Sequence, residues 1–429
     1  MKDESKQSEA QAVKALRDAG YSFVEREKRL QGSGQNRVCD LVAWGAGLDG
    51  EFKPQVSVEI KSRRSAEAAG LAMALAQLSA YAANLGTPVN LVYIDGEWLQ
   101  ADAGFMSLTP IDGPPECPAA EGIVRNPEVL RQLLNSRVWD MASEARHKSH
   151  LIEGEALRVI LDEIQLDDDG FIRGLKTGVL TSPELFIRTW LTAAGDSRDF
   201  TAAGDRHYFM RESVTASEVT SAMVQIAEPQ AGDVVFDPFA GFGGLLLAAA
   251  TYPSAIQGID ISGNDINPTA HAIAQRLLNL LGHGGEVRWE DSTVKPWPQA
   301  DIVMSTPPIG IKLNEATQLP FGQVRDMDVA AIAWAAEALK PGGRAVLLTS
   351  RGWTFRSGDA ARLRSWLAEN YHVAALIGLP SVSRLTTMPM LLTVIDKLPS
   401  SESIIADLTD DWQMQLAPSS ELTRLLKRR

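Results

Sequence analysis

Five polar side chains near the N-terminus have the types and the order of a site that cleaves phosphodiesters. Asp40 comes first, Glu59 and Lys61 follow two residues apart, and Gln77 and Tyr81 follow four apart. Two carboxylates can bind Mg²⁺, which takes oxygen ligands and keeps water molecules available to attack phosphate. A lysine beside them can orient or activate that water and stabilise charge in the transition state. The sequence therefore predicts Asp40 and Glu59 as metal ligands, assisted by the other three side chains.

A glycine-rich turn in the second half of the chain has the pattern of a nucleotide-like ligand site. Asp237 closes an apolar run, another apolar run begins at Leu245, and between them lie Phe239, Gly241 and Gly243. A strand that ends in a carboxylate, then a glycine turn, then a helix, brings backbone close to such a ligand. Glycine suits the turn because a side chain would block that approach or demand a strained positive φ. The alternative is a glycine turn that only connects a strand to a helix.

Three further predicted strands end in polar groups. Asp265, with Asn267 in the same turn, ends the second strand, where a carboxylate could bind ribose hydroxyls. Asp291 follows a short β-like run. The fourth strand, 301–304, leads into a rigid turn composed of Thr306, Pro307, Pro308 and Ile309. Strands that alternate with helices form a parallel-dominated open sheet, so these groups are expected at its carboxyl edge.

Residues from about Tyr208 to about Lys397 resemble the S-adenosylmethionine (SAM)-dependent DNA methyltransferases that modify the exocyclic amino group of adenine. The resemblance is greatest to the modification subunits of type I restriction systems, whose glycine motif reads much like residues 237–244. It implies that Asp237 and the glycines line the methionine part of SAM, that Asp265 binds the ribose and that Asp291 binds the adenine amine. It also implies that Thr215 or Ser217 caps a helix aimed at the SAM carboxylate. The implied cofactor-binding residues are Thr215, Asp237, Phe239, Gly241, Gly243, Asp265, Asn267 and Asp291.

The catalytic motif departs from that family, which usually has Asn-Pro-Pro-aromatic where this chain has Thr306 to Ile309. The family's Asn oxygen and a proline carbonyl accept both amine hydrogens, and its aromatic residue stacks on the flipped base. Thr306 has a shorter side chain, Ile309 has no π-surface, and Pro307 keeps its carbonyl. SAM binding with slow or absent adenine methylation is therefore expected. The alternative is that Thr306 is a tolerated variant and methylation is normal.

The five N-terminal residues resemble the PD-(D/E)xK nuclease superfamily. Gln77 and Tyr81 match the Gln-x-x-x-Tyr of its RecB-like branch, and the N-terminal nuclease domains of type I restriction subunits look similar. The resemblance implies a Mg²⁺-dependent nuclease. The alternative is a solvated ion-pair cluster of Asp40, Glu59 and Lys61 on a nuclease-like fold that only binds DNA.

The elements that must position these residues follow from periodicity. Helices are expected at 8–19 and 66–85, and strands at 21–24, 38–44, 56–61 and 89–94. A linker at 103–122 precedes a mainly helical stretch, 126–198, whose His147 and His150 have no partners at metal-ligand spacing. Seven strands are expected in the methyltransferase-like part: 233–237, 261–266, 286–289, 301–304, 345–349, 373–378 and 391–396. Residues 404–407 are a candidate edge strand, and Lys427 to Arg429 are expected to be a solvated tail.

The fold class expected from these elements is α/β. A restriction-endonuclease-like domain at 1–112 precedes a helical connector at 113–205, a Rossmann-like methyltransferase domain at 206–400 and a C-terminal edge strand and tail at 401–429. At 429 residues the chain is long enough for two or three domains. Two cysteines are too few for a disulfide framework or a zinc site.

The composition constrains location and partners. The chain has no apolar run long enough to span a membrane and no signal peptide, so a cytoplasmic protein is expected. A net charge of −13 does not favour general adhesion to nucleic acid, although a DNA-binding groove needs only a local basic surface. Nothing long remains after Lys397 for target recognition, so a specificity subunit or another restriction-system subunit is an expected partner besides DNA.

Two functions remain open. The first is a restriction–modification or phage-defence protein that combines a Mg²⁺-dependent nuclease-like domain with an adenine DNA methyltransferase-like domain. The second is a SAM-binding pseudo-methyltransferase that acts as a sensor or scaffold and regulates a nuclease or a partner. Methylation of RNA or of a small molecule is a weaker third interpretation, because a SAM site does not identify the acceptor.

Overall fold

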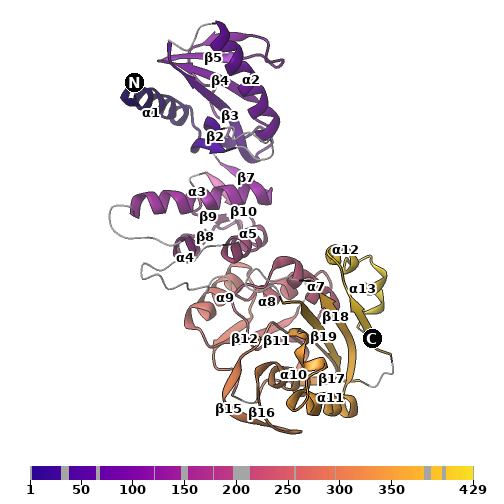
Figure 1. The fold of residues 1–429 in the computed structure, drawn as a ribbon. Coiled ribbons are helices and arrows are strands. Elements are labelled where there is room, and N and C mark those ends of the chain that lie inside the picture. The colour runs from indigo at the N-terminus through magenta and orange to yellow at the C-terminus, as the bar shows by residue number, and fades with distance from the viewer. Residues whose placement is uncertain are drawn as a thin grey trace. The chain divides into compact units, whose positions relative to one another are not determined.

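In the computed structural model the chain divides into two compact units, Met1–Trp190 and Leu191–Arg429 (Figure 1). Each unit is described by itself. The structure describes residues 2–29, 38–63, 68–119, 121–145, 153–176, 178–196, 213–255, 258–294, 296–380, 388–398 and 402–428. Tyr208, where the resemblance begins, and His147 and His150 lie outside these residues. No helix in the described part is long and apolar enough to cross a membrane.

The N-terminal unit is built on a six-stranded mixed sheet in the order β1-β2-β3-β4-β5-β6. Strands β3 and β4 are parallel and the other pairs are antiparallel. The strands are β1 (Phe23–Arg29), β2 (Val38–Ala46), β3 (Phe52–Lys61), β4 (Val89–Ile94), β5 (Glu97–Ala101) and β6 (Leu108–Ile111). Strands β5 and β6 were not expected from the sequence, which placed β6 in a linker.

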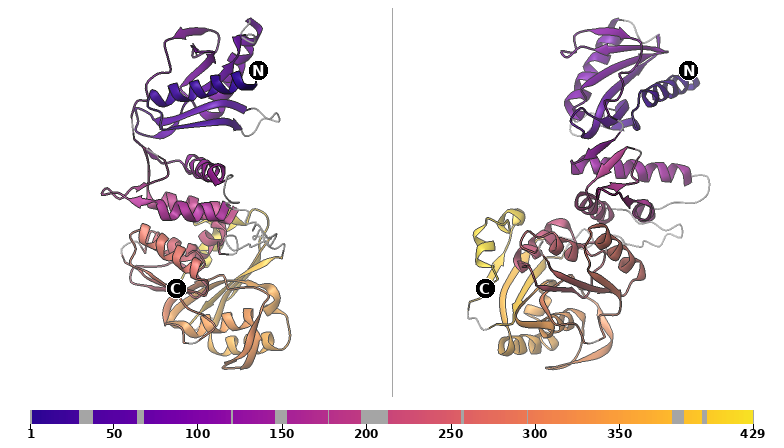
Figure 2. Two further views of the ribbon diagram at one scale, coloured as in Figure 1. Left: turned by 90° about the vertical axis from the view of Figure 1, so that its left-hand side faces the viewer. Right: turned by 180° about the vertical axis from the view of Figure 1, so that it is seen from behind.

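Two helices complete the fold of this sheet (Figure 2). Helix α1 (Lys2–Asp18) buries Ala12, Val13 and Leu16 in one core with Val58 of β3. Side chains along a strand alternate between faces, so Glu59 and Lys61 project from the face opposite Val58. Helix α2 (Ala68–Leu85), which connects β3 to β4, contacts that opposite face. The sheet therefore has a closed core on the α1 side and polar side chains on the α2 side.

Residues 122–196 complete the N-terminal unit and begin the next. Helices α3 (Pro127–Ala145), α4 (Glu153–Glu163) and α5 (Pro183–Asp196) confirm the mainly helical expectation. A small sheet, not expected, accompanies them in the order β7-β10-β9-β8. Its strands are β7 (Gly122–Val124), β8 (Gln165–Leu166), β9 (Ile172–Arg173) and β10 (Val179–Thr181). The boundary between the two units falls within α5.

The C-terminal unit contains an eight-stranded sheet in the order β13-β12-β11-β14-β17-β19-β18-β20. All neighbours are parallel except β19, which is antiparallel to both of its partners. All seven expected strands are present, and the candidate strand at 404–407 is an eighth, at the edge. They are β11 (Val234–Asp237), β12 (Asp260–Asp265), β13 (Glu286–Trp289), β14 (Ala300–Ser305), β17 (Leu339–Ser350), β18 (His372–Leu379), β19 (Met390–Asp396) and β20 (Ile404–Asp407).

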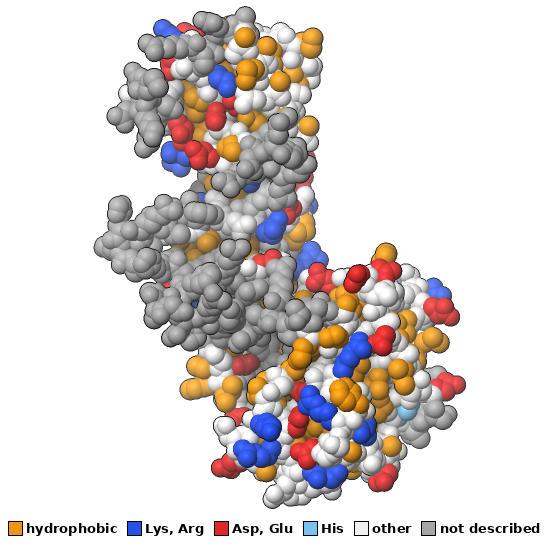
Figure 3. Space-filling view, viewed as in Figure 1, with side chains coloured by type: hydrophobic (Ala, Val, Ile, Leu, Met, Phe, Trp, Pro, Cys, Tyr) orange, Lys and Arg blue, Asp and Glu red, His pale blue; other side chains and the backbone are white. Residues whose placement is uncertain are grey.

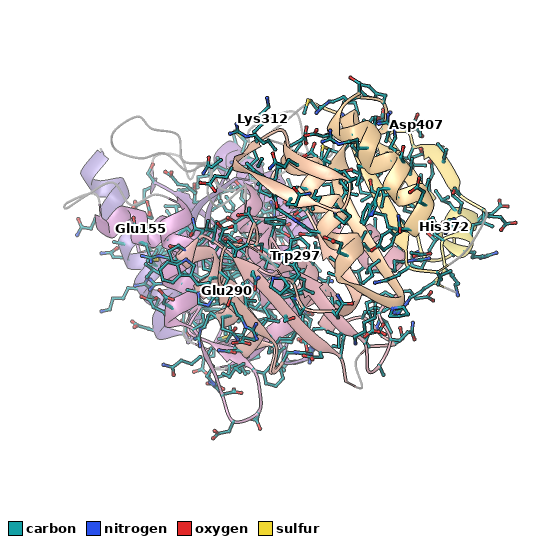
Figure 4. All side chains as sticks on the ribbon, turned by 90° about the horizontal axis from the view of Figure 1, so that it is seen from below. Glu155, Glu290, Trp297, Lys312, His372 and Asp407 are labelled. Carbon is teal, nitrogen blue, oxygen red and sulfur yellow. The ribbon has the colours of Figure 1, made fainter. Side chains whose placement is uncertain are left out.

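Helices cover both faces of this sheet, as Figure 1 shows. One layer comprises α7 (Ser217–Ala227), α8 (Gly244–Ala250) and α9 (Pro268–Leu280), and the other α10 (Met327–Ala338) and α11 (Asp359–Asn370). In Figure 4 Trp297 lies centrally in the unit, where it packs against Phe236 of β11 and Trp334 of α10. Strands β15 (Lys312–Leu319) and β16 (Gly322–Asp326) form a separate hairpin that was not expected.

The C-terminal segment is part of this unit, which corrects the expectation of a solvated tail. After the short helices α12 (Trp412–Gln415) and α13 (Glu421–Leu425), Arg428 lies 2.5 Å from the Asp233 carboxylate, with its side chain 18% exposed. Its backbone N–H also bonds to Glu228 at the end of α7. The buried Arg344 of β17 donates to the Leu426 carbonyl. Specific partners therefore hold Leu426 and Arg428, whereas the Lys427 side chain is 63% exposed and Arg429 lies outside the described residues.

Candidate functional site

The five N-terminal residues meet in one cluster on the α2 side of the sheet. The Lys61 Nζ donates to Glu59 Oε1 at 2.6 Å and to Gln77 Oε1 at 3.1 Å. The Tyr81 hydroxyl donates to Glu59 Oε2 at 2.8 Å. Asp40 lies on the neighbouring strand, where its Oδ2 accepts from a backbone N–H of β3 at 2.7 Å. The structure therefore brings together the five side chains that the sequence singled out, and their function stays a prediction.

Burial and like charge make this cluster electrostatically unusual. Burial, followed by the negative charge of Glu59, raises the pKa of Asp40 to about 6. Burial and Glu59 also raise the pKa of Tyr81, so its hydroxyl stays a donor. Glu9 on α1, which the sequence reasoning did not identify, adds to the raised pKa of Asp40. Glu9 could hardly have been singled out from the sequence, since one glutamate on an amphipathic helix is most simply a solvated residue.

The donor set of this cluster fits a magnesium ion with two protein ligands. No group of three His, Cys, Asp or Glu side chains within the described residues is placed to hold a metal. Mg²⁺ is commonly bound through one or two carboxylates, with waters and substrate phosphates completing its shell. A carboxylate has about four lone-pair sites, so Glu59 can accept from Lys61 and Tyr81 and still bind a cation.

The second site lies at the carboxyl edge of the eight-stranded sheet, where Asp237 is almost fully buried. Its Oδ1 accepts from Ser305 Oγ at 2.6 Å and from Phe239 N–H at 3.1 Å. It thereby ties the glycine turn after β11 to the end of the adjacent strand β14. Burial is the largest cause that raises the pKa of Asp237, to about 7.

Asp265 joins the glycine turn to the end of β12. Its Oδ2 accepts from Gly241 N–H and its Oδ1 from Asn267 N–H, both at 2.8 Å. Gly241 has φ +54°, and a Cβ there would lie 2.4 Å from the Ser213 carbonyl oxygen. Gly243 also has a positive φ, of +78°. Glycine is therefore required at both positions for the turn that Asp265 organises.

Helices α7 and α9 both begin beside this turn, and only α9 has the side-chain cap that its local sequence predicts. The Asn267 side chain caps α9 by accepting from Thr269 N–H and Ala270 N–H. The expectation that Thr215 or Ser217 caps α7 is wrong, because the N-cap is Ala216 and no side chain caps it. The Thr215 hydroxyl instead forms a tertiary hydrogen bond.

That tertiary partner of Thr215 is Thr306, with 3.0 Å between the two hydroxyl oxygens. Either hydroxyl can be the donor. If Thr306 donates, its oxygen keeps lone pairs for an incoming amine hydrogen. Pro307 is buried, Pro308 is exposed and Ile309 is half-buried. The turn thus places a hydroxyl and an apolar surface where the related motif has an amide and an aromatic ring.

Asp291 and its surroundings form the outer part of this edge. Asp291 is exposed, and its Oδ1 accepts from both the backbone N–H and the hydroxyl of Thr293. Two large apolar side chains nearby are also exposed, Ile266 by 66% and Trp289 by 63%. The Trp289 indole N–H donates to the Ile266 carbonyl. The sequence reasoning gave these two residues no role, although a tryptophan at the end of an exposed strand was a usable signal.

The visible surface of the C-terminal unit has mixed charge. Figure 3 shows Lys and Arg side chains interspersed with Asp and Glu. Several arginines near the carboxyl edge are paired with acids, such as Arg356 with Asp326 and Arg351 with Asp407. Neighbouring carboxylates therefore partly neutralise these arginines, which do not form a single positively charged patch.

Comparison with known proteins identifies the C-terminal part. Residues 207–409 match the family model described as N-6 DNA Methylase. This part of the chain is therefore similar to N6-adenine DNA methyltransferases. It is similar to the methylase subunit of the type I restriction enzyme StySPI of Salmonella potsdam, with 25% identity over 207 residues, which are 42% of this chain and 38% of that protein.

Two further comparisons broaden that likeness. The methyltransferase domain is 28% identical over 179 residues to the tRNA (guanine(10)-N(2))-methyltransferase of Rattus norvegicus, covering 33% of this chain and 38% of that protein. A solved structure of a putative class I SAM-dependent methyltransferase from Listeria monocytogenes shares the fold, with a TM-score of 0.53 and 16% identity, covering 70% of this chain and 99% of that one. The chain spans about two fifths of the length of the curated relatives.

Proposed function

We propose that the methyltransferase domain binds SAM at the carboxyl edge of its sheet and methylates an exocyclic amino group of a DNA base. The observation that carries the proposal is Asp265, which holds Gly241 and Asn267 and so joins the glycine turn to the second strand end. The family match of residues 207–409 supports DNA as the acceptor.

The residues of this edge fit SAM chemically. Asp265 has lone pairs beyond those used by the two amides, which ribose hydroxyls can use. Asp237 is a buried carboxyl with a raised pKa, and the cationic methionine end of SAM would favour its charged form. The exposed Ile266 and Trp289 offer apolar faces for the adenine ring, and Asp291 an acceptor for its amine.

The chain's own residues would then prepare the acceptor amine. SAM supplies a methyl group, and transfer forms the N–C bond as the S–C bond breaks and one amine proton leaves. The Pro307 carbonyl and the Thr306 hydroxyl accept the amine hydrogens, which directs the nitrogen lone pair toward the methyl group. Ile309 packs on the flipped base with less attraction than an aromatic ring would give.

The test is a transfer assay with tritiated SAM and three acceptors: genomic DNA, tRNA and no nucleic acid. Incorporation into DNA, at the amino group of adenine, is the expected result. Incorporation into tRNA alone would move the proposal to an RNA methyltransferase, as in the tRNA-modifying relative. Tight SAM binding without transfer to any acceptor would favour the sensor or scaffold function instead.

We also propose a second function, Mg²⁺-dependent cleavage of DNA by the N-terminal unit. The specific observation in its favour is the direct contact of Lys61 and Tyr81 with Glu59, beside Asp40. Asp40 and Glu59 would hold the ion, and Lys61 would orient the water that attacks phosphorus as the P–O bond to the leaving hydroxyl breaks. Nicking of supercoiled plasmid with Mg²⁺ but not with EDTA is expected. DNA binding without nicking would show that the N-terminal unit binds DNA but does not cleave it.

Together these proposals describe a protein of the restriction–modification or phage-defence type. The relatives named in the comparisons are methylase subunits of type I restriction enzymes, so we propose that a partner, such as a specificity subunit, reads the DNA sequence. Size-exclusion chromatography of the protein purified from its native host, with mass spectrometry of any co-eluting chain, tests this; elution as a single chain alone would contradict it.

A further inference from the structure

A buried carboxylate that neither proposed activity uses lies behind the Thr306–Gly310 turn. Asp328, in the first turn of α10, is 2% exposed. Its Oδ1 accepts from the Gly310 backbone N–H at 3.4 Å, and its Oδ2 accepts from the Ser350 hydroxyl. Gly310 ends the turn that follows β14, and Ser350 ends β17. One carboxylate therefore connects the turn to the end of the adjacent strand.

The same region has a second link between the turn and α10. The Met327 backbone N–H donates to the Ile311 carbonyl at 3.2 Å. The next residue, Lys312, begins the β15–β16 hairpin, and Figure 4 labels it. At its other end the turn is held by the bond between Thr306 and Thr215. The segment that would face the target base is thus held at both ends, and Asp328 holds the end closer to Ile309.

Stability alone does not account for a carboxylate at this position. Among the described residues no Lys or Arg forms an ion pair with Asp328, and the nearby Arg356 pairs with Asp326 instead. A buried charge without a cationic partner costs folding free energy, and burial raises the pKa of Asp328 accordingly. Two acceptor oxygens on a short side chain can, however, receive a backbone amide and a hydroxyl at once.

We propose that Asp328 is a positioning residue for the Thr306–Gly310 turn, which it holds against the end of β17 in the geometry that methyl transfer requires. In this role it would act through the turn rather than by touching SAM or the base. The inference rests on the proposed methyltransferase function, since it assigns a role toward the same site. A displacement of about 1 Å in a group that orients a reactant can cost about 10²-fold in rate.

The experiment compares Asp328→Asn with Asp301→Asn in the full chain. Asp301 serves as the control, because it also accepts a backbone amide, Val234 N–H at 2.9 Å, but lies near the start of β14, at the opposite edge of the sheet. Unlike Asp328, it is partly exposed and also pairs with Lys340. Asparagine keeps the volume of aspartate and replaces one acceptor oxygen by a donor. Asp328→Asn is expected to lower kcat by about 10- to 100-fold and leave the Kd for SAM within about twofold. Asp301→Asn is expected to leave both unchanged even if its Tm falls.

Hydrogen exchange of the Ile309, Gly310 and Ile311 amides gives a readout that needs no acceptor. Faster exchange in Asp328→Asn, but not in Asp301→Asn, is expected. Unchanged exchange, an unchanged kcat, or a kcat that falls only in proportion to SAM affinity would overturn the inference. If the wild type transfers no methyl group to any acceptor, the proposed function fails and the exchange comparison alone decides whether Asp328 holds the turn. Ser350→Ala, which removes one partner of the carboxylate, is expected to have a smaller effect in the same direction.

Discussion

The two candidate sites of this chain differ in how their side chains are held. In the N-terminal cluster the functional groups bond directly to one another, with Glu59 receiving both Lys61 and Tyr81. At the carboxyl edge of the C-terminal sheet, Asp265 instead bonds to backbone amides of turns. If the proposed functions hold, the first arrangement would present charged side chains to a metal ion and a phosphate. The second would shape the backbone around an extended ligand.

The two sites also differ in the kind of evidence that supports them. The C-terminal site lies within residues 207–409, which match a methyltransferase family model, yet its catalytic turn carries Thr306 and Ile309. The N-terminal cluster lies outside the residues that the family model matches, and Lys61, Gln77, Tyr81 and Glu59 are in contact there. A set of side chains in contact and a likeness to a family are separate kinds of evidence.

The largest effect is expected in the N-terminal cluster. Glu59→Gln keeps the size of the side chain but removes the charge that binds Lys61 and would bind Mg²⁺. Loss of a group that stabilises developing charge typically costs about 10²–10³ in rate, and loss of the ion costs more. Plasmid nicking should therefore fall by about 10³-fold or more in Glu59→Gln and in Asp40→Ala.

A solvated ion pair of the same unit provides the control. Asp49 pairs with Lys53 at the turn after β2, and its side chain is 52% exposed. Asp49→Asn should leave nicking unchanged. If Asp40→Ala and Glu59→Gln also leave nicking unchanged, the cleavage comes from elsewhere, and the contacts among these side chains are only structural.

The next largest effect concerns the catalytic turn. Thr306→Asn with Ile309→Phe should raise adenine methylation by about 10²–10³-fold, because it restores an acceptor aimed at the amine and a ring that stacks on the base. Thr215→Val, which removes only the partner of the Thr306 hydroxyl, serves as the control and should not raise the rate. Vigorous incorporation by the wild type into mixed genomic DNA, with no gain in the double variant, would show that threonine suffices.

The sequence predicted the positions of carboxylates at strand ends better than it predicted the hydrogen-bond partners of hydroxyl groups. Asp237 and Asp265 end strands, and parallel strands bring their ends to one edge. The position of Asp237 followed from the apolar run before it, and that of Asp265 from its place in the next predicted strand. The bond between Thr215 and Thr306 joins residues 91 apart, and a hydroxyl rotates to whichever partner the tertiary fold provides. Local cap rules therefore assigned Thr215 to α7, and the tertiary bond overrode them.

Short edge elements were also difficult to predict from the chain. Strands β5 and β6 and the β15–β16 hairpin went unrecognised, because half-exposed strands carry few apolar positions. Asp328 had no signal of its own, since one carboxylate in the first turn of a helix is common. Its role depends on Gly310 and Ser350, which reach it from separate segments of the chain.

A smaller effect is expected where one carboxylate would bind one part of SAM. Asp265→Ala removes the acceptor for ribose hydroxyls and also releases Gly241 and Asn267. Loss of a hydrogen bond to a charged group costs about 1.5–3 kcal/mol, so the Kd for SAM should rise about 10- to 100-fold. Calorimetry is the measurement, with Asp260→Asn at the other end of β12 as the control. Unchanged affinity in Asp265→Ala would remove the ribose assignment.

The smallest effect is a pH dependence of SAM binding that Asp237 should produce. Burial raises the pKa of Asp237 to about 7, so in the free protein the carboxyl is neutral below that pH and ionised above it. A cationic ligand favours the ionised form and lowers this pKa, so binding below pH 7 must release a proton. Affinity should therefore rise as pH increases toward 7 and level off above it, by up to about tenfold between pH 6 and 8.

The free energy of unfolding of the ligand-free protein should instead fall as pH rises over the same range. A carboxyl whose pKa is raised by folding binds its proton more tightly when folded, so its contribution is fully present below the unfolded pKa and is lost as pH rises through about 7. Asp237→Asn cannot ionise and should flatten both profiles, whereas Asp265→Ala should weaken SAM binding and keep the slope. A slope that persists in Asp237→Asn would place the titrating group elsewhere and separate Asp237 from the cationic end of the ligand.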